Sequence, residues 1–140
     1  SLALRGLQSL GLRLAHLEGA TLEVANWLVD QDVIAEVYHP ALPGCPGHEI
    51  WKRDFTGSAS VFSSMFQDAV SAAQAPVFLD ALNSVQIGLS WGGVTSLAVV
   101  YPDLDRPGKD FGGRLVRLNI GLEHPADLIE DLHQAMEAAL

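Results

Sequence analysis

The chain has 140 residues, with 17 acidic and 8 basic side chains, a net charge of −9, and 49% hydrophobic residues. A chain of this length forms one domain and buries roughly two-thirds of the surface that its unfolded form exposes. The hydrophobic content excludes intrinsic disorder. The negative charge repels phosphate backbones and anionic lipid surfaces, and the few basic residues are scattered, so we expect neither nucleic acid nor membrane as a partner.

Cys45 is the single cysteine, which excludes an internal disulfide framework and is typical of an intracellular protein. No apolar run approaches the roughly 20 residues of a membrane-spanning helix. Charged residues such as Arg5, Arg13 and Glu18 interrupt the leucines near the N-terminus, which argues against a signal peptide. We therefore predict a soluble, cytoplasmic protein.

Apolar residues recur every three or four positions from Leu2 to about Gln31, the pattern of an amphipathic helix. We predict one long helix over residues 2–31, with a bend or break near Gly19, because glycine weakens a helix by up to about 1 kcal/mol relative to alanine. Such a helix would be about 43 Å long. Because this exceeds what so small a domain can cover, we expect the helix to pack on something larger.

Short segments rich in β-branched and aromatic residues follow this helix. They predict strands over residues 33–38, 60–66, 86–89 and 95–100. The proline- and glycine-rich stretch 40–47 predicts a loop, and residues 75–83 have helical spacing. Trp91-Gly92-Gly93 predicts a tight turn between the last two of these strands.

The clearest strand covers residues 115–122. Its alternation places four apolar side chains on one face and Arg117 on the other; the four are Val116, Leu118, Ile120 and Leu122. Pro125 then begins a helix that runs to Leu140. This order of elements predicts an α+β fold, a two-layer sandwich. Its mostly antiparallel sheet has about four to five strands with helices packed on one face, and the long N-terminal helix leads it.

Several stretches contain reactive or charged residues, and each has a simpler interpretation. Cys45-Pro-Gly-His48, with His39 nearby, contains metal-ligand types, but a second ligand pair at zinc-site spacing is missing, so we predict no metal site. Cys45 as a nucleophile would require a shaped pocket. Trp91-Gly92-Gly93 lacks the glycine patterns of nucleotide loops. Trp51-Lys-Arg-Asp54 is typical of a solvated loop.

Arg117 leaves two alternatives open. The strand pattern alone predicts a solvent-exposed side chain on the face away from the core. The alternative is a fixed guanidinium that binds a carboxylate through two parallel hydrogen bonds.

Four motifs, in this order, resemble one enzyme family. They are His39-Pro-Ala-Leu-Pro-Gly44, Gly47-His-Glu-Ile-Trp-Lys-Arg-Asp-Phe-Thr-Gly-Ser58, Ser90-Trp-Gly-Gly93 and Val116-Arg-Leu-Asn-Ile-Gly-Leu-Glu123. The chain resembles the C-terminal domain of the pyridoxal-phosphate-dependent Cys/Met metabolism family over essentially all of its length. Residues 51–57 and the Ser90 motif resemble the cystathionine β-lyase branch of that family.

The resemblance implies a fold-type-I subunit in which residues 1–31 link two domains and residues 32–140 form the C-terminal small domain. The large domain, which holds pyridoxal phosphate on a Schiff-base lysine, is then absent from this chain. Lys52 and Lys109 are the only lysines, and neither has a suitable setting. We therefore expect no bound pyridoxal phosphate, no catalytic residue and no activity in this chain alone.

The resemblance also implies a function for the whole enzyme. It would be a carbon–sulfur lyase of methionine biosynthesis that converts cystathionine to homocysteine, pyruvate and ammonia, and a homo-oligomer, since the family is tetrameric. Arg117 would hold the substrate α-carboxylate, with Ser90 and Trp91 shaping the adjacent wall. The alternatives are a γ-lyase or γ-synthase of the same family, or a non-catalytic interaction module derived from it.

Overall fold

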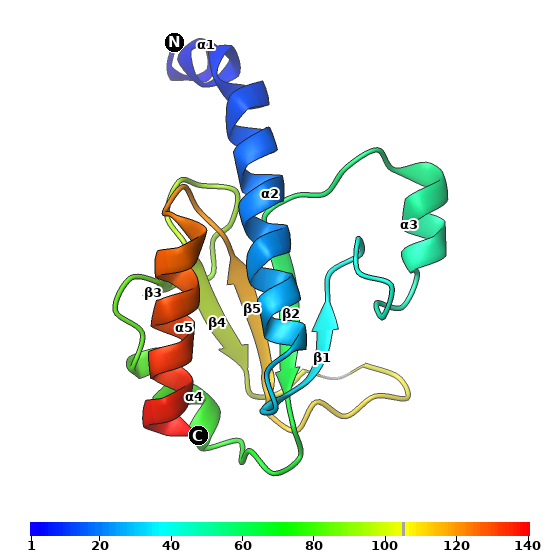
Figure 1. Ribbon diagram of the computed structural model, residues 1–140, viewed down its shortest axis with the longest axis vertical. Helices are drawn as coiled ribbons and strands as arrows, with labels where there is room; N and C mark the ends of the chain where they lie inside the picture. The colour runs from blue at the N-terminus through cyan, green and yellow to red at the C-terminus, as the bar shows by residue number, and fades with distance from the viewer. Residues whose placement is uncertain (105) are drawn as a thin grey trace.

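The computed structural model describes residues 1–104 and 106–140 (Figure 1). Among these residues it contains five helices and a five-stranded sheet, in agreement with the predicted α+β class. In chain order the elements are α1 (Leu2–Gln8), α2 (Leu10–Val29), β1 (Ile34–Tyr38), α3 (His48–Asp54), β2 (Val61–Phe66), α4 (Gln74–Asp80), β3 (Gln86–Ile87), β4 (Leu97–Tyr101), β5 (Leu115–Asn119) and α5 (Pro125–Ala139).

The sheet has the strand order β1-β2-β5-β4-β3. The β1–β2, β2–β5 and β5–β4 pairs are antiparallel, which confirms the mostly antiparallel sheet, whereas β3 pairs with β4 in parallel. The expected tight turn at Trp91-Gly92-Gly93 is therefore wrong. Parallel neighbours require a connection that returns along the sheet, so residues 88–96 form a longer crossing loop instead of a hairpin.

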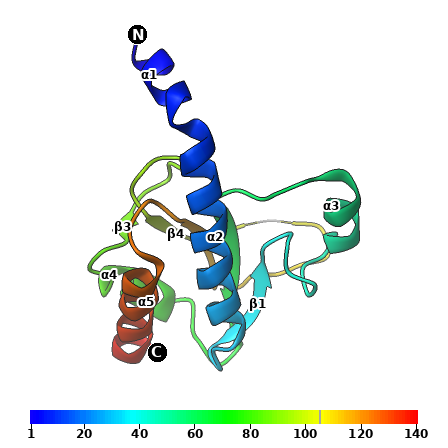
Figure 2. The same ribbon diagram turned by 45° about the horizontal axis from the view of Figure 1, so that its top comes forward.

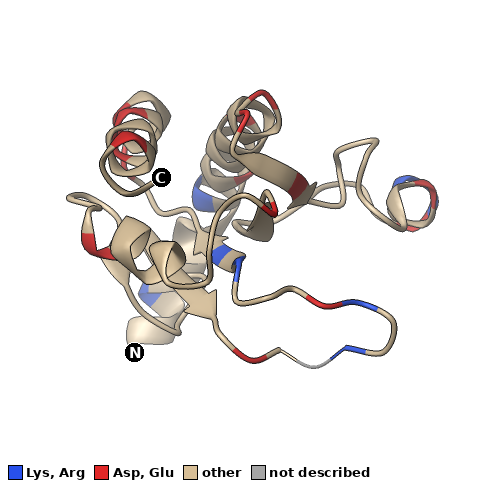
Figure 3. Cartoon of the chain, turned by 90° about the horizontal axis from the view of Figure 1, so that it is seen from below, with Lys and Arg blue, Asp and Glu red and all other residues tan. Residues whose placement is uncertain are grey.

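The helices that form the second layer, α2, α4 and α5, lie on one face of the sheet, as predicted, whereas α1 and α3 extend away from it (Figure 1). α2 and α5 cover this face, and α4 packs against α5 and β4 (Figures 1 and 2). The core lies between the two layers and includes Val24, Leu28, Phe62, Leu118 and Leu132. Viewed from below, the charged segment 106–114, which leads into β5, lies on the opposite, helix-free side of the sheet (Figure 3).

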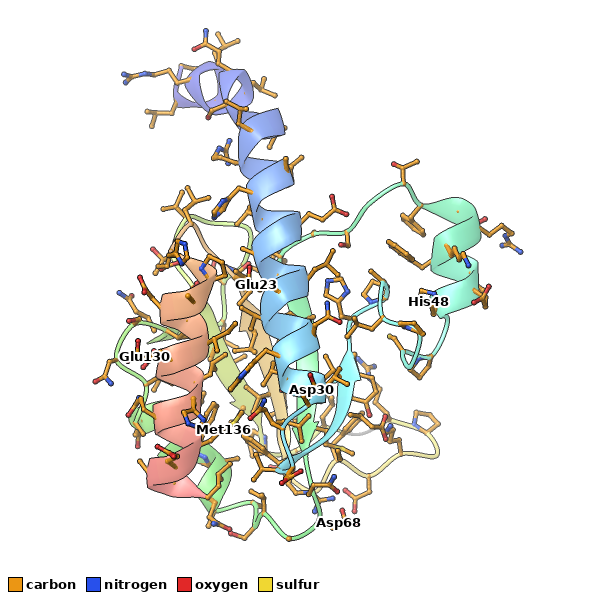
Figure 4. The ribbon with its side chains drawn as sticks, in the orientation of Figure 1. Glu23, Asp30, His48, Asp68, Glu130 and Met136 are labelled. Carbon is orange, nitrogen blue, oxygen red and sulfur yellow. The ribbon has the colours of Figure 1, made fainter. Side chains whose placement is uncertain are left out.

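The surface of the helical layer carries part of the negative charge. Glu23 extends from α2, Asp30 from the cap that follows α2, and Glu130 from α5 (Figure 4); all three are exposed. Among the described residues, no helix combines the length and apolar character needed to cross a membrane.

The long N-terminal helix is interrupted at Ser9 and not near Gly19. Ser9 leaves the helical conformation (φ −108°, ψ 4°), and Arg13 bonds to both sides of the break, through its Nε to Ser9 Oγ (3.2 Å) and its Nη2 to the Gly6 carbonyl (2.7 Å). Gly19 lies inside α2, next to the buried Ala20, because packing against the core outweighs the weak helix propensity of glycine. α1 has no buried residue.

The segment Trp51–Asp54 is helical, so its prediction as a solvated loop is wrong. Gly47 has a left-handed φ of 84° and lets the chain turn into α3. The Trp51 ring stacks on His48 (centroids 5.8 Å apart), and its Nε1 donates to the Gly57 carbonyl (3.1 Å). His48 lies on the same helix, α3, beside the main body (Figure 4). The stacking and the hydrogen bond stabilise α3 locally, and hydropathy does not reveal them.

The faces of β5 are predicted correctly at three of the four apolar positions. Val116, Leu118 and Ile120 are buried in the core, but Leu122 lies beyond the end of the strand and is 39% exposed. On the opposite face Leu115 and Asn119 are also buried. Loops therefore cover parts of the helix-free face, and only a portion of it remains open around Arg117.

Candidate substrate-binding site

Arg117 occupies the middle of the sheet on its helix-free face. It lies in β5 between Ser63 of β2 and Val99 of β4, in register with both. The alternation that buries Val116 and Leu118 under the helices directs the Arg117 side chain to the other side. Three neighbouring strands thus fix the backbone from which this guanidinium extends.

The guanidinium of Arg117 is held by one carbonyl and two aromatic rings. Its Nη2 donates a short hydrogen bond to the carbonyl of Leu89. Its Cζ lies 5.4 Å from the centroid of the Trp91 ring and 5.8 Å from that of Tyr101, within cation–π distance. The side chain is partly buried. These contacts restrict the fork to a small set of orientations.

Arg117 also differs from Arg53 and Arg114 in its electrostatic setting. Arg53 and Arg114 form ion pairs with Asp54 and Asp68, at 2.7 Å in each case. Within the described part of the chain, no carboxylate lies within ion-pair distance of Arg117. A positive charge placed on an apolar and aromatic surface in this way attracts an anion from outside.

Ser90 and Trp91 lie in the 88–96 loop, beside Arg117. Trp91 is 64% exposed, and its ring is the one that contacts the guanidinium. Ser90 is exposed and follows Leu89, whose carbonyl binds Arg117; its hydroxyl makes no hydrogen bond to the described residues. The structure therefore brings the three predicted residues together, although Arg117 is distant from the other two in sequence.

A cavity of about 350 Å³ opens next to Arg117 on the same face. Its lining is mostly aromatic or apolar and includes Tyr38, Tyr101, Phe111 and Leu115; Ser63 and a second arginine, Arg106, add polar groups. Burial raises the pKa of Tyr38, so its phenol stays protonated at neutral pH. A small open volume thus lies beside the Arg117 guanidinium.

Asn119 is a residue of this site that sequence reasoning missed. Its side chain is 1% exposed and forms hydrogen bonds to the Gly92 N–H (2.9 Å) and the Thr95 carbonyl (3.2 Å) of the 88–96 loop. The available signal is an amide residue at an otherwise apolar end of a strand, on the same face as Arg117.

Neither lysine fits a Schiff-base site for pyridoxal phosphate. Lys109 Nζ pairs with Glu36 (2.8 Å) and lies 4.7 Å from the Tyr38 ring centroid; the hydrogen bond to Glu36 raises its pKa and keeps it protonated. Lys52 is exposed on α3. A Schiff-base lysine requires a neutral amine in a partly desolvated pocket. Neither lysine among the described residues is therefore suited to form the Schiff base.

The remaining reactive side chains have structural settings. Burial raises the pKa of the Cys45 thiol, which opposes formation of a nucleophilic thiolate. His48 Nδ1 lies 2.8 Å from the Pro40 carbonyl. His39 is fully buried, and its Nδ1 accepts from the Ala41 N–H (3.2 Å). Among the described residues, no three His, Cys, Asp or Glu side chains are grouped as metal ligands.

Helices on one face, and an arginine between aromatic rings on the other, define an α+β domain whose helix-free face is partly open around Arg117. Residues 1–137 match the family described as Cys/Met metabolism PLP-dependent enzyme, and the chain belongs to this family. The resemblance noted in its motifs is thereby confirmed.

Individual relatives also match over most of this chain. The chain is 43% identical to the cystathionine beta-lyase of Salmonella typhimurium, over 91% of this chain and 34% of that protein. It is 38% identical to the L-alanine/L-glutamate racemase of Wolbachia pipientis, over 96% of this chain and 34% of that protein. A solved O-acetylhomoserine sulfhydrylase from Wolinella succinogenes has a TM-score of 0.78 and 28% identity, over 93% of this chain and 35% of that one. The chain thus spans about a third of the length of these proteins.

Proposed function

We propose that this chain contributes the substrate-carboxylate site of a carbon–sulfur lyase that acts on cystathionine. The net reaction consumes water and gives homocysteine, pyruvate and ammonia. The similarity to a cystathionine beta-lyase over nine-tenths of the chain supports the reaction, and Ser90-Trp91-Gly92-Gly93 supports the branch of the family.

The observation that carries the proposal is the setting of Arg117. A guanidinium held between Trp91 and Tyr101, with one nitrogen bonded to the Leu89 carbonyl, retains other N–H groups for an incoming carboxylate. Fixing the carboxylate in this way orients an amino acid before any bond is broken. Trp91 excludes water from one side of the ion pair, and Ser90 offers a hydroxyl at its edge.

The pyridoxal phosphate implied by the family would be held by other parts of the protein, because Lys52 and Lys109 do not fit it. When bound, the cofactor supplies the electron-withdrawing chemistry that carbon–sulfur cleavage needs. We therefore propose that the present residues bind and orient the substrate, and that catalysis requires an oligomeric enzyme larger than this chain.

The test is steady-state kinetics of the whole enzyme with Arg117→Ala, Arg117→Lys and Arg114→Ala. Loss of one partner of a buried, hydrogen-bonded charge pair costs roughly 2–5 kcal/mol, so kcat/KM should fall about 30-fold or more in Arg117→Ala. Lysine should rescue only partly, because an ammonium group cannot form two parallel hydrogen bonds. Arg114→Ala should remain near normal, since its partner Asp68 is solvent-exposed. Unchanged activity of Arg117→Ala would refute the proposed site.

A second reaction is supported by the Wolbachia relative, which is named a racemase and is nearly as similar to this chain as the lyase. Racemisation of an amino acid would use the same carboxylate contact at Arg117. The products separate the two reactions. Thiol and pyruvate formed from L-cystathionine support the lyase, whereas D-alanine formed from L-alanine supports the racemase.

A further inference from the structure

The conformation of the 88–96 loop decides whether Trp91 contacts Arg117. This loop is the crossing connection between the parallel strands β3 and β4, and most of its residues are exposed, including Leu89, Trp91 and Val94. An exposed connection of this kind needs specific contacts to keep one conformation. Arg117 bonds to the carbonyl of Leu89 at the start of the loop, and the contacts that hold its middle and far end come from Asn119 and from residues 122–123.

Asn119 holds the middle of the loop through both ends of its amide. Its Oδ1 accepts from the Gly92 N–H (2.9 Å) and from Ser60 Oγ (3.0 Å), and its Nδ2 donates to the Thr95 carbonyl (3.2 Å). The side chain is 1% exposed, so water does not compete for these bonds. The amide thus joins the start of β2, the end of β5 and two points of the loop.

The bond to Gly92 acts directly on Trp91. The Gly92 N–H belongs to the peptide unit that begins at the Trp91 carbonyl, and that unit is planar. Fixing this N–H therefore fixes the plane that follows the Trp91 Cα. Gly92 has a left-handed φ of 74°, which most other residues would adopt only with strain.

Asn119 and Arg117 lie on the same face of the same strand, two residues apart. The group that fixes the loop and the group that the loop contacts are therefore held by one rigid element. The Trp91 ring lies 5.4 Å from Arg117 Cζ. Since Trp91 is mostly exposed, packing alone provides little to hold it there.

Other hydrogen bonds hold the end of the loop that leads into β4. Glu123 accepts from the Ser96 N–H (2.9 Å) and Ser96 Oγ (2.7 Å), and the Leu122 N–H donates to the Val94 carbonyl (2.8 Å). These bonds hold the entry to β4 without Asn119. Loss of the Asn119 amide should therefore release the middle of the loop while β4 stays paired.

We infer that Asn119 is a positioning residue that holds Trp91 against Arg117 and so keeps the guanidinium oriented for a carboxylate. The first half of this inference concerns the present chain only. The second half, the consequence for substrate binding, rests on the proposed function.

The first experiment uses the 140-residue chain labelled with 5-fluorotryptophan and followed by ¹⁹F NMR. Trp91→Phe assigns the Trp91 signal among the three tryptophans. Arg117→Ala gives the ¹⁹F chemical shift of Trp91 without the guanidinium. Asn119→Ala should change the Trp91 chemical shift in the same direction and broaden the resonance. Ser60→Ala is the matched control, because it removes one bond of Asn119 and leaves both bonds to the loop; its Trp91 signal should stay in place.

The second experiment measures the whole enzyme. Asn119→Ala should raise the KM about tenfold with a smaller change in kcat, because a displaced binding group weakens substrate binding before it affects chemistry. Ser60→Ala should differ from wild type by less than about twofold. If Asn119→Ala does not fold, Asn119→Ser replaces it, since the shorter side chain cannot span the distance to Gly92.

An unchanged Trp91 signal in Asn119→Ala, beside a shifted signal in Arg117→Ala, would overturn the positioning role whatever the reaction is. A shifted signal with an unchanged KM would overturn its consequence for the substrate, provided that Arg117→Ala impairs the enzyme. If Arg117→Ala leaves activity intact, the proposed function fails, and the NMR result alone decides whether Asn119 positions Trp91.

Discussion

Asp131 offers a sharp test of how this domain is held together. It lies on α5, is 5% exposed, and accepts four hydrogen bonds. Three come from backbone N–H groups between α4 and β3, at Asn83 (2.8 Å), Ser84 (2.8 Å) and Val85 (3.0 Å), and the fourth from Gln134 Nε2 (3.0 Å). One carboxylate thus joins the last helix to the start of the parallel edge strand.

Asp131→Ala should destabilise the chain by about 3 kcal/mol. The Val85 N–H is buried and would lose its acceptor, which costs about 1–3 kcal/mol. The Asn83 and Ser84 N–H groups are more exposed and can turn to water, so they add less. Since a domain of this size is stable by roughly 5–15 kcal/mol, the variant should still fold.

The assay is urea unfolding at pH 7, with Asp127→Ala on the same helix as the matched control. Asp127 is exposed in the first turn of α5 and interacts with the helix dipole, which is worth about 0.3–1 kcal/mol. Equal losses of unfolding free energy in the two variants would refute this reasoning. They would show that the four hydrogen bonds of Asp131 stabilise the chain no more than one charge at a helix end does.

The difference should also depend on pH. Burial raises the pKa of Asp131, but the three backbone N–H groups and Gln134 outweigh it, and the net pKa lies below the ordinary value. A depressed pKa in the folded state gives stability that is complete above the unfolded pKa, about 3.9, and is lost as the pH falls through the folded pKa. The gap between wild type and Asp131→Ala should therefore be constant above pH 5 and shrink below pH 4; a constant gap down to pH 2 would contradict this.

Three further predictions concern other parts of the chain. Burial lowers the pKa of His39 below its unfolded value of about 6.5, so the stability of the wild type should fall as the pH drops from 7 toward 5. The urea midpoint of His39→Gln should lack this dependence on pH, and the same dependence in both proteins would contradict the prediction. Gly121→Ala should lower the free energy of unfolding by about 1–3 kcal/mol, because a Cβ there would overlap the Val94 carbonyl and the Ser96 nitrogen. Thermal unfolding measures this loss, and Gly44→Ala, with open space around the residue, should be nearly neutral. The exposed leucines of α1 and α2 should make the chain self-associate in light scattering, and Leu4→Ser with Leu12→Ser should shift it toward monomer; a wild-type monomer at high concentration would argue against this.

Much of the fold follows from signals that are local in sequence. The apolar alternation of Val116, Leu118 and Ile120 identifies β5 and its buried face, because side chains in a strand point to opposite faces in turn. Pro125 marks the first turn of α5, where a missing N–H is harmless. The motifs that carry the family resemblance are likewise continuous stretches, so the family could be recognised without any contact.

Features that depend on distant partners could not be predicted in this way. Ser9 and not Gly19 interrupts the N-terminal helix, because core packing of α2 from Leu17 onward overrides the cost of a glycine. The helix at His48–Asp54 is stabilised by a stacked pair and by a hydrogen bond to Gly57, which hydropathy does not reveal. The parallel pairing of β3 with β4 converts an expected turn into a crossing loop.

The candidate site also combines features that the sequence predicts with features that depend on distant partners. The strand period alone places Arg117 on the helix-free face, and the family resemblance selects Ser90 and Trp91 as its neighbours. Only the tertiary structure shows that the Trp91 ring contacts the guanidinium, and that Asn119 bonds to Gly92 of the same loop, 27 residues away in sequence. A pattern of side chains determines which face a residue occupies, whereas its partners across that face depend on which distant segment the fold brings there.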